Sequence, residues 1–264
     1  MNSRQLLHLR LRAPTTRLSS PSKCFIRNTS TATPPPPTGK SSPWIRRLIY
    51  AGIFGSLGVV AGSRVDRLVA APPLQGSQED KKALEEIQRV YELGIPIVQE
   101  LRKNPDYVEA DVYQDFSEES KRHRLTSGPL AGSRGIALQR VFSNDAEKKM
   151  VSVVYFGSAL EGWPTMVHGG ALGTVIDENM GRAALRHFPA RTGLTANLNI
   201  NYRAPVYSGN FYTFHTQLDP ERSTDVKGYV SCQIRDQAGQ LCVEASGLFV
   251  VPKKFQLARM GDKF

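Results

Sequence analysis

The chain has 264 residues and a formal net charge of +10 at pH 7. The charge lies at one end: residues 1–65 carry ten Lys and Arg and no acid, whereas from Asp66 onwards 24 basic residues face 24 acidic ones. The electrically balanced remainder lacks the basic surface that nucleic-acid binding requires, so no nucleic-acid partner is expected. With 40% hydrophobic and 22% charged residues, the roughly 200 residues after the basic stretch are typical of one globular domain with accessory segments.

The three cysteines do not indicate a metal site. Cys24, Cys232 and Cys242 form no CxxC motif and no Cys/His spacing that would bind zinc. We expect Cys232 and Cys242 to be reduced core thiols, with a disulfide across a hairpin as the alternative.

Residues 1–43 are predicted to be a mitochondrial transit peptide followed by a Pro-rich linker. The stretch is rich in Arg, Ser, Thr and Leu, and Pro34–Pro37 then forms a stiff spacer. A disordered basic tail is the alternative interpretation.

A single transmembrane helix is predicted over residues 44–65. The uncharged run Leu48–Ser63 has 16 residues, which span about 24 Å as a helix, and Trp44 with the flanking arginines can lengthen it. A hydrophobic extension of the presequence is the alternative. Because Arg46 and Arg47 precede the run, the positive-inside tendency places the amino side in the matrix and the following domain in the intermembrane space. The prediction is therefore a single-pass protein of the mitochondrial inner membrane.

Residues 66–128 are predicted to form a helical cap or linker. Apolar residues recur at helical spacing over 78–103, and Gly94 and Pro96 break this helix. Residues 106–124 are polar and are expected to be irregular.

Residues 129–255 are predicted to form an α+β domain, followed by a tail over 256–264. A helix is expected over 168–187, and six runs with period-two alternation predict strands: 135–142, 150–156, 195–203, 211–218, 228–235 and 241–251. Two strands, a helix and four more strands predict a curved antiparallel sheet wrapped around a central helix.

The segment Met166–Gly181 contains the first candidate site. Gly169 and Gly170 stand where the helix should begin, and a helix amino terminus offers unpaired N–H groups to a developing oxyanion. Asp177 lies about two turns further along, so we expect it in the same cleft. Alternatively, His168 orients the turn and the glycines only shape it. Glu178 points away from Asp177 and is expected to be structural or to lie at a subunit interface.

The strand 195–203 alternates between an apolar and a polar face. The predicted apolar face consists of Ala196, Leu198, Ile200 and Tyr202. The predicted polar face consists of Thr195, Asn197, Asn199, Asn201 and Arg203. Asparagine is depleted in strands, so three of them suggest a surface for a ligand or a second subunit.

Three features together resemble the PaaI-type hot-dog thioesterases: the motif HGG, an aspartate nine residues after its histidine, and the strand TANLNINYRAP. The mitochondrial acyl-CoA thioesterase branch is the most similar, and the resemblance covers about residues 130–253. The anchored architecture is similar to fungal mitochondrial membrane members. The resemblance implies a hot-dog fold, an oligomer that is a homodimer or a dimer of dimers, and hydrolysis of acyl-CoA to fatty acid and CoA.

The resemblance also implies roles for individual residues. Asp177 matches the catalytic carboxylate, which acts as general base or nucleophile. Thr195 matches a hydroxyl that positions the attacking water and is supplied by the facing subunit. His168 and Gly169 match the turn that polarises the thioester carbonyl. The residues that match contacts to coenzyme A are Asn201, Arg203 and Lys227.

This chemistry needs neither a metal nor an organic cofactor, since coenzyme A belongs to the substrate. A Ser-His-Asp mechanism is not expected, because the chain has no GxSxG motif. The alternative from a different class is a membrane-anchored module that binds acyl-CoA or a protein without turnover. A hot-dog hydratase is a third possibility. The sequence does not specify the acyl-chain length.

Overall fold

The computed structural model of the protein describes residues 43–69, 73–254 and 257–261 and divides the chain into two compact units, residues 1–68 and 69–264. Apart from Pro43, the predicted transit peptide and linker lie outside the described residues.

The first unit contains all but the last residue of helix α1, Pro43–Val69. Its segment Trp44–Gly62 is long and apolar enough to cross a membrane, and none of it is buried within the protein. Large apolar side chains such as Phe54 and Val59 are more than 70% exposed. The predicted helix over 44–65 is confirmed, and membrane crossing stays a prediction.

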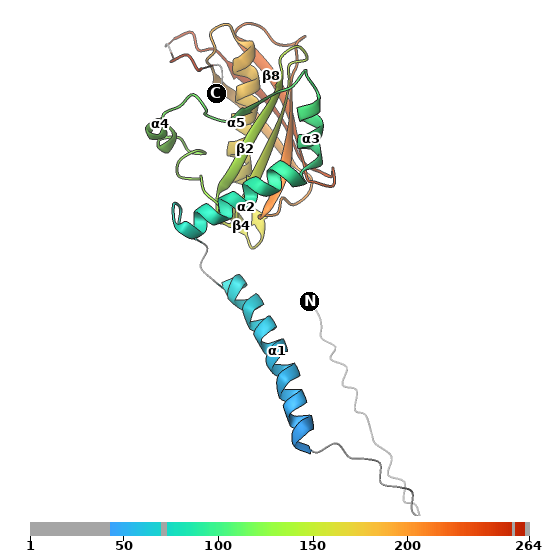
Figure 1. The fold of residues 1–264 in the computed structure, drawn as a ribbon. Coiled ribbons are helices and arrows are strands. Elements are labelled where there is room, and N and C mark those ends of the chain that lie inside the picture. The colour runs from blue at the N-terminus through green and yellow to red at the C-terminus, as the bar shows by residue number, and fades with distance from the viewer. Residues whose placement is uncertain (1–42, 70–72, 255–256, 262–264) are drawn as a thin grey trace, which may run out of the picture. The chain divides into compact units, whose positions relative to one another are not determined.

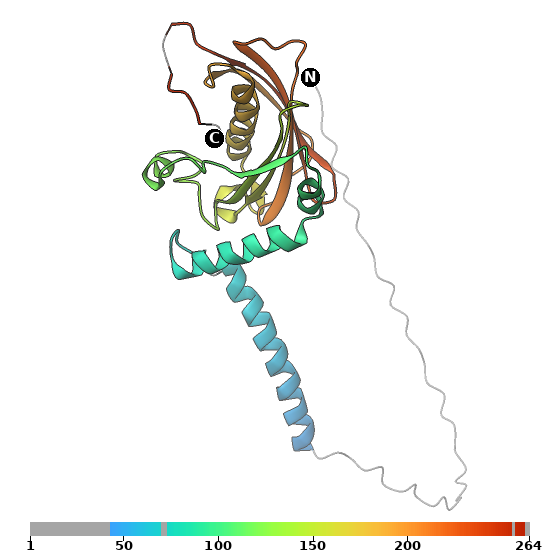
Figure 2. The same ribbon diagram turned by 45° about the horizontal axis from the view of Figure 1, so that its top comes forward.

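The second unit is an antiparallel sheet wrapped around one long helix, α5, Gly169–His187 (Figures 1 and 2). The sheet has seven strands in the order β1-β2-β3-β7-β8-β9-β6. Their bounds are β1 Val108–Asp111, β2 Ile136–Asn144, β3 Lys149–Phe156, β6 Leu194–Tyr202, β7 Asn210–Leu218, β8 Lys227–Arg235 and β9 Leu241–Val250. This is the hot-dog fold that the resemblance implied, and all six predicted strands are confirmed.

The main core lies between α5 and the concave face of the sheet. Val175, Ile176 and Met180 of α5 are fully buried, and they belong to one cluster with Phe156 and Phe214 of the sheet. Apolar residues at helical spacing give α5 one apolar face, and apolar residues at every second position give each strand one apolar face. These faces pack against each other. Cys232 and Cys242 are buried free thiols, as predicted.

A second core lies on the other face of the sheet, beneath α2, Gln78–Gly94, and α3, Pro96–Lys103. Val98 of α3 packs there in one cluster with Phe142 and Val153 of the sheet. The predicted break is confirmed, since Pro96 begins the second helix, where its missing N–H is not needed.

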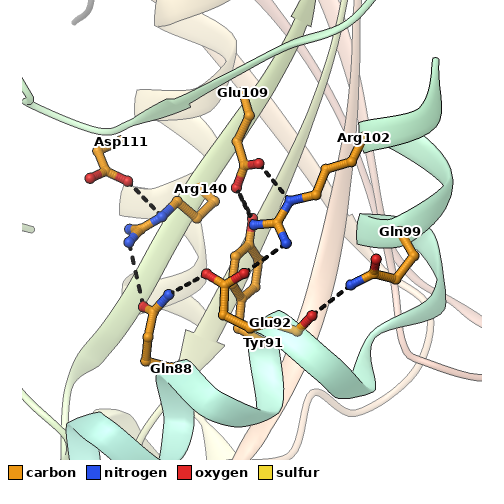
Figure 3. Close-up of polar contacts among 8 residues, drawn as sticks. All are labelled: Gln88, Tyr91, Glu92, Gln99, Arg102, Glu109, Asp111 and Arg140. Atoms are coloured by element: carbon orange, nitrogen blue, oxygen red, sulfur yellow. Dashed lines mark hydrogen bonds and ion pairs between the residues drawn. The ribbon is translucent and has the colours of Figure 1, made fainter. Parts of the chain in front are cut away.

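Figure 3 shows the polar brace that fixes these helices to β1. Glu109 of β1 accepts a hydrogen bond from the Tyr91 hydroxyl of α2 at 2.7 Å and two from the Arg102 guanidinium of α3 at 2.7 and 2.9 Å. Arg102 also bonds Glu92 of α2 at 2.7 Å. One carboxylate therefore connects three elements.

Strand β1 corrects the prediction that residues 106–124 are irregular. Its four residues pair with β2, with Glu109 opposite Phe142. Its residues, Val108 to Asp111, do alternate between apolar and polar, but the run is only four residues long, the shortest in which alternation indicates a strand. The other short elements were also not predicted: α4 Glu118–Arg122, the 3-10 turn Ser158–Leu160, β4 Glu161–Trp163 and β5 Met166–Val167.

Candidate active site

Asp177 and Thr195 form the first part of the site. The Thr195 hydroxyl donates a hydrogen bond to Asp177 Oδ1 at 2.7 Å, joining the middle of α5 to the start of β6. Both residues line a cavity of about 470 Å³. We call this cavity the aspartate cavity. The hydroxyl and carboxylate oxygens can both still accept hydrogen bonds from one water molecule beside them, which would orient that water.

A β-bulge explains why Thr195 reaches the helix. Thr195 pairs with Phe249 and Asn197 pairs with Leu248, so Ala196 is an extra residue in β6. The bulge reverses the alternation at this point. Thr195 therefore lies on the helix side together with Leu198 and not with Asn197, which corrects the predicted polar face.

Thr195 and Asp177 belong to the same chain in this hydrogen bond. The bulge turns Thr195 inward against its own helix. The expectation that the facing subunit supplies the hydroxyl that positions the attacking water concerns an oligomer, and it stays a prediction.

The turn His168–Gly169 forms the second part of the site. His168 is the N-cap of α5, and its Nδ1 accepts a hydrogen bond from the Gly170 N–H at 2.9 Å. The Gly169 N–H, at the first position of the helix, donates to no protein group among the described residues. It is thus available to a ligand oxygen, and the helix dipole adds positive potential there.

Tyr202, which the sequence placed only on an apolar face, belongs to this turn. Its hydroxyl donates to the Gly169 carbonyl at 2.8 Å. A Cβ on Gly169 would lie 3.2 Å from the Tyr202 hydroxyl oxygen, a tight contact that the tyrosine would have to relieve by moving a few tenths of an ångström. The tyrosine holds the Gly169–Gly170 peptide, which directly follows the free Gly169 N–H.

The two parts lie in separate cavities. Gly169 and Asp177 are eight residues apart on one helix, a distance of about 12 Å along its axis. The turn lines its own cavity of about 480 Å³, with Trp163 and Arg203, and Asp177 does not line it. We call it the turn cavity. The prediction that Asp177 shares a cleft with the glycines is therefore wrong within one chain.

The three predicted coenzyme A contacts are not brought together. Arg203 lines the turn cavity and its Nε bonds Glu244 Oε2 at 2.9 Å. Asn201 lies next to Tyr202 on β6 and so points to the opposite face of the sheet, where it contacts Asn199. Lys227 lies at the other end of the sheet, opposite Val250, and lines neither cavity.

Glu178, beside Asp177, is structural as predicted. Its Oε1 accepts hydrogen bonds from Thr126 at 2.9 Å and from the Arg182 guanidinium at 2.8 Å. Both side chains of the pair are nearly buried, at 11% and 1% exposure. Burial raises the pKa of Glu178, and the neighbouring Arg182 opposes this shift.

Within the part of the chain that the structure describes, no group of three or more His, Cys, Asp or Glu side chains is arranged to hold a metal ion.

A family model described as the thioesterase superfamily matches residues 165–243. The acyl-coenzyme A thioesterase THEM4 of Mus musculus is 32% identical over 137 residues, which cover 51% of this chain and 57% of that protein. The uncharacterized mitochondrial membrane protein FMP10 of Saccharomyces cerevisiae is 28% identical over 166 residues, 59% of this chain and 62% of the relative. Among solved structures, the E. coli PaaI protein from the phenylacetic acid degradation operon is 17% identical with a TM-score of 0.35, over 40% of this chain and 74% of that one.

The matched segment contains the turn, all of α5 and the strands β6 to β8. The resemblance to the thioesterase superfamily is thus confirmed, and it is residues 165–243 that match the model of that superfamily. The matched region of this chain spans little more than half the length of the mouse relative.

Proposed function

We propose that the protein hydrolyses acyl-CoA thioesters to a fatty acid and CoA. The observation that carries this proposal is the hydrogen bond between Thr195 and Asp177 in a cavity on α5. Asp177 would act as a base on a water that Thr195 helps to position, and the Gly169 N–H would donate a hydrogen bond to the oxyanion. The acyl-CoA thioesterase THEM4 of mouse supports the substrate class.

A complete site requires two copies of the chain. One thioester carbonyl cannot reach the Gly169 N–H and the Asp177 water together across about 12 Å of helix. Strand β6 is an edge of the sheet and is largely exposed, including Leu194 at 42% and Tyr202 at 53%. An exposed strand edge pairs readily with another strand.

Antiparallel pairing of two β6 strands would join the two parts. With the two-fold axis at Leu198, Thr195 of one copy lies opposite Asn201 of the other. The start of β6 adjoins Asp177, and its end adjoins the turn. The aspartate cavity of one copy would then adjoin the turn cavity of the other, and the two-fold symmetry gives two such sites in each dimer.

In this composite site the proton and electron movements balance. Asp177 takes a proton from water as the water oxygen attacks the thioester carbon, and the Gly169 N–H of the other copy binds the resulting oxyanion. Collapse breaks the carbon–sulfur bond, and the CoA thiolate receives the proton from Asp177. Acting as a nucleophile, the same carboxylate would instead attack the carbon and displace the CoA thiolate, which gives a mixed anhydride. Water would then hydrolyse the anhydride to the fatty acid, regenerate Asp177 and supply the proton of the CoA thiol. Arg203, beside the turn, offers a cation to the CoA phosphates, and Asn201 and Lys227 stay proposed contacts.

We also propose that α1 anchors the protein in the mitochondrial inner membrane as a single span. The apolar segment Trp44–Gly62 and the mitochondrial membrane protein FMP10 of yeast support this placement. Alkaline carbonate extraction of mitochondria is expected to leave the protein in the membrane pellet. Protease protection of intact mitochondria against mitoplasts then tests whether the domain faces the intermembrane space.

The function is tested by CoA release from acyl-CoAs of graded chain length, using the full chain in detergent micelles. Asp177→Asn is expected to lower hydrolysis at least about a hundredfold, in the range of general-base effects. Asp225→Asn is the matched control, because Asp225 is exposed and lines neither cavity. Undiminished hydrolysis in Asp177→Asn would contradict the role of Asp177. Binding of acyl-CoA without any release by the unaltered protein would favour the binding module.

A further inference from the structure

The segment between β1 and β2 crosses over to the helix side of the sheet. We call residues 113–126 the strap. The strap begins at the β1 edge of the sheet and ends against α5, where Thr126 bonds Glu178 (Figure 2). It precedes the matched superfamily segment, residues 165–243, by nearly 40 residues.

Buried polar contacts fix the strap to the helix residue next to Asp177. Thr126 and Tyr113 are 5% and 6% exposed and their hydroxyls bond each other at 3.2 Å. Arg182 places its guanidinium 5.2 Å from the Tyr113 ring and bonds Glu178. A buried cation needs such partners, so these contacts hold the strap in place.

The fixed strap forms one wall of the aspartate cavity. It contributes His123, Arg124 and Leu125, besides the anchors Tyr113 and Thr126. The opposite wall is a stripe on α5 at helical spacing, Asp177, Gly181 and Leu185. From Asp177 to Leu185 this stripe is about 12 Å long.

The cavity has a mixed lining, in which polar residues such as His123, Arg124 and Thr174 accompany an apolar set. The apolar set consists of Leu185, Leu194 and Phe249 together with Leu125, which is 54% exposed. Apolar side chains in the same cavity as the reacting carboxylate offer a surface to a hydrocarbon chain.

Gly181 keeps this cavity open. A Cβ at this position would meet only the Phe249 ring, 3.5 Å away, which is ordinary van der Waals contact. Packing therefore does not require glycine, although glycine destabilises the interior of a helix relative to alanine. Its effect on the structure is the space that it leaves beside Asp177.

We infer that the strap and α5 together form an acyl-chain groove and that Leu125 and Gly181 determine how long a chain it accepts. This inference rests on the proposed function. The thioester carbonyl lies at Asp177, and the chain runs along α5 toward Leu185 with Leu125 covering it.

The test compares kcat/KM for acyl-CoAs from acetyl to palmitoyl, using the full chain in detergent micelles. Gly181→Val fills the groove, so the ratio of long-chain to short-chain kcat/KM is expected to fall at least about tenfold, the effect of a few methylene groups in a pocket. Leu125→Ala removes the cover and is expected to move the optimum to longer chains. Gly181→Ala is also expected to lower the ratio of long-chain to short-chain kcat/KM. Because alanine favours the helix, a fall in this variant cannot be attributed to a folding defect.

Leu93→Ala is the matched control, because Leu93 is 79% exposed on α2, far from the cavity in sequence and not among its lining residues. It is expected to leave the chain-length profile unchanged. Active enzyme with the same profile in Gly181→Val, Gly181→Ala and Leu125→Ala would overturn the inference and leave the function standing. No CoA release by the unaltered protein would instead overturn the function. In that case, the binding of free fatty acids tests the groove separately. A chain-length dependence that Leu125→Ala changes would support the groove, and a dependence that no variant changes would overturn the groove.

Discussion

At the scale of single residues, the local backbone decides what each side chain contacts. Ala196 is the extra residue of a bulge, and it turns Thr195 from the outer face of β6 to the face that carries Tyr202. Both residues then contact α5, Thr195 at Asp177 and Tyr202 at Gly169. A strict period of two puts them on opposite faces, so alternation alone assigns only Tyr202 to the helix side.

The Thr195 hydroxyl can be tested by an isosteric change. Thr195→Val keeps the shape but removes the hydrogen bond to Asp177, so kcat is expected to fall about tenfold or more while KM changes little. Thr195→Ser restores a hydroxyl and is expected to recover most of the activity. Equal kcat for Thr195→Val and the unaltered protein would contradict a role for the hydroxyl in positioning water. Because Thr195 is exposed, thermal denaturation is expected to show similar stability for all three proteins.

At the scale of elements, the brace around Glu109 attaches α2 and α3 to β1. The Arg102 hydrogen bonds hold the pKa of Glu109 below its ordinary value of 4.5, and the Tyr91 hydroxyl adds to this effect while burial opposes it. A carboxyl with a lowered pKa in the folded state stabilises the fold above its unfolded pKa. That stabilisation is lost as pH falls below about 5 and through the folded pKa.

Glu109→Gln is therefore expected to lower the free energy of unfolding by about 1–2 kcal/mol at neutral pH. The difference from the unaltered protein should shrink as the pH falls, because protonation removes the same charge. Urea denaturation at a series of pH values measures this. Glu86→Gln is the control, since Glu86 and Arg89 form an ion pair with 57% and 68% of their side chains exposed and contribute little. A difference that is independent of pH would show that the charge of Glu109 does not stabilise the brace.

At the scale of the whole molecule, one chain carries a donor turn and a base that are too far apart to act on one thioester. The two parts lie near opposite ends of β6, the exposed edge of the sheet. A composite site across two copies can be tested by mixing two inactive variants. Asp177→Asn removes the base, and Gly169→Val obstructs the turn beside the Tyr202 hydroxyl.

Each variant alone is expected to be nearly inactive. After joint unfolding and refolding, random pairing makes half the dimers mixed, and each mixed dimer has one intact site, so activity should recover to about a quarter of that of the unaltered protein. CoA release by the mixture, compared with the sum of the separate variants, measures this. An absence of recovery, in a mixture shown to contain mixed dimers, would place the whole site within one chain.

The sequence by itself determined the main strands, the break between α2 and α3, the long helix α5 and the residues His168, Gly169 and Asp177. These depend on local periodicity, on proline and glycine, and on a motif of fixed spacing, all of which are present in a linear chain. Only the tertiary structure decided which of these residues meet. The bulge at Ala196 set the direction of Thr195, the rise of α5 separated Gly169 from Asp177, and the strap reached Glu178 from more than 50 residues away in sequence. Such contacts depend on three-dimensional packing between distant segments, and no local pattern specifies them.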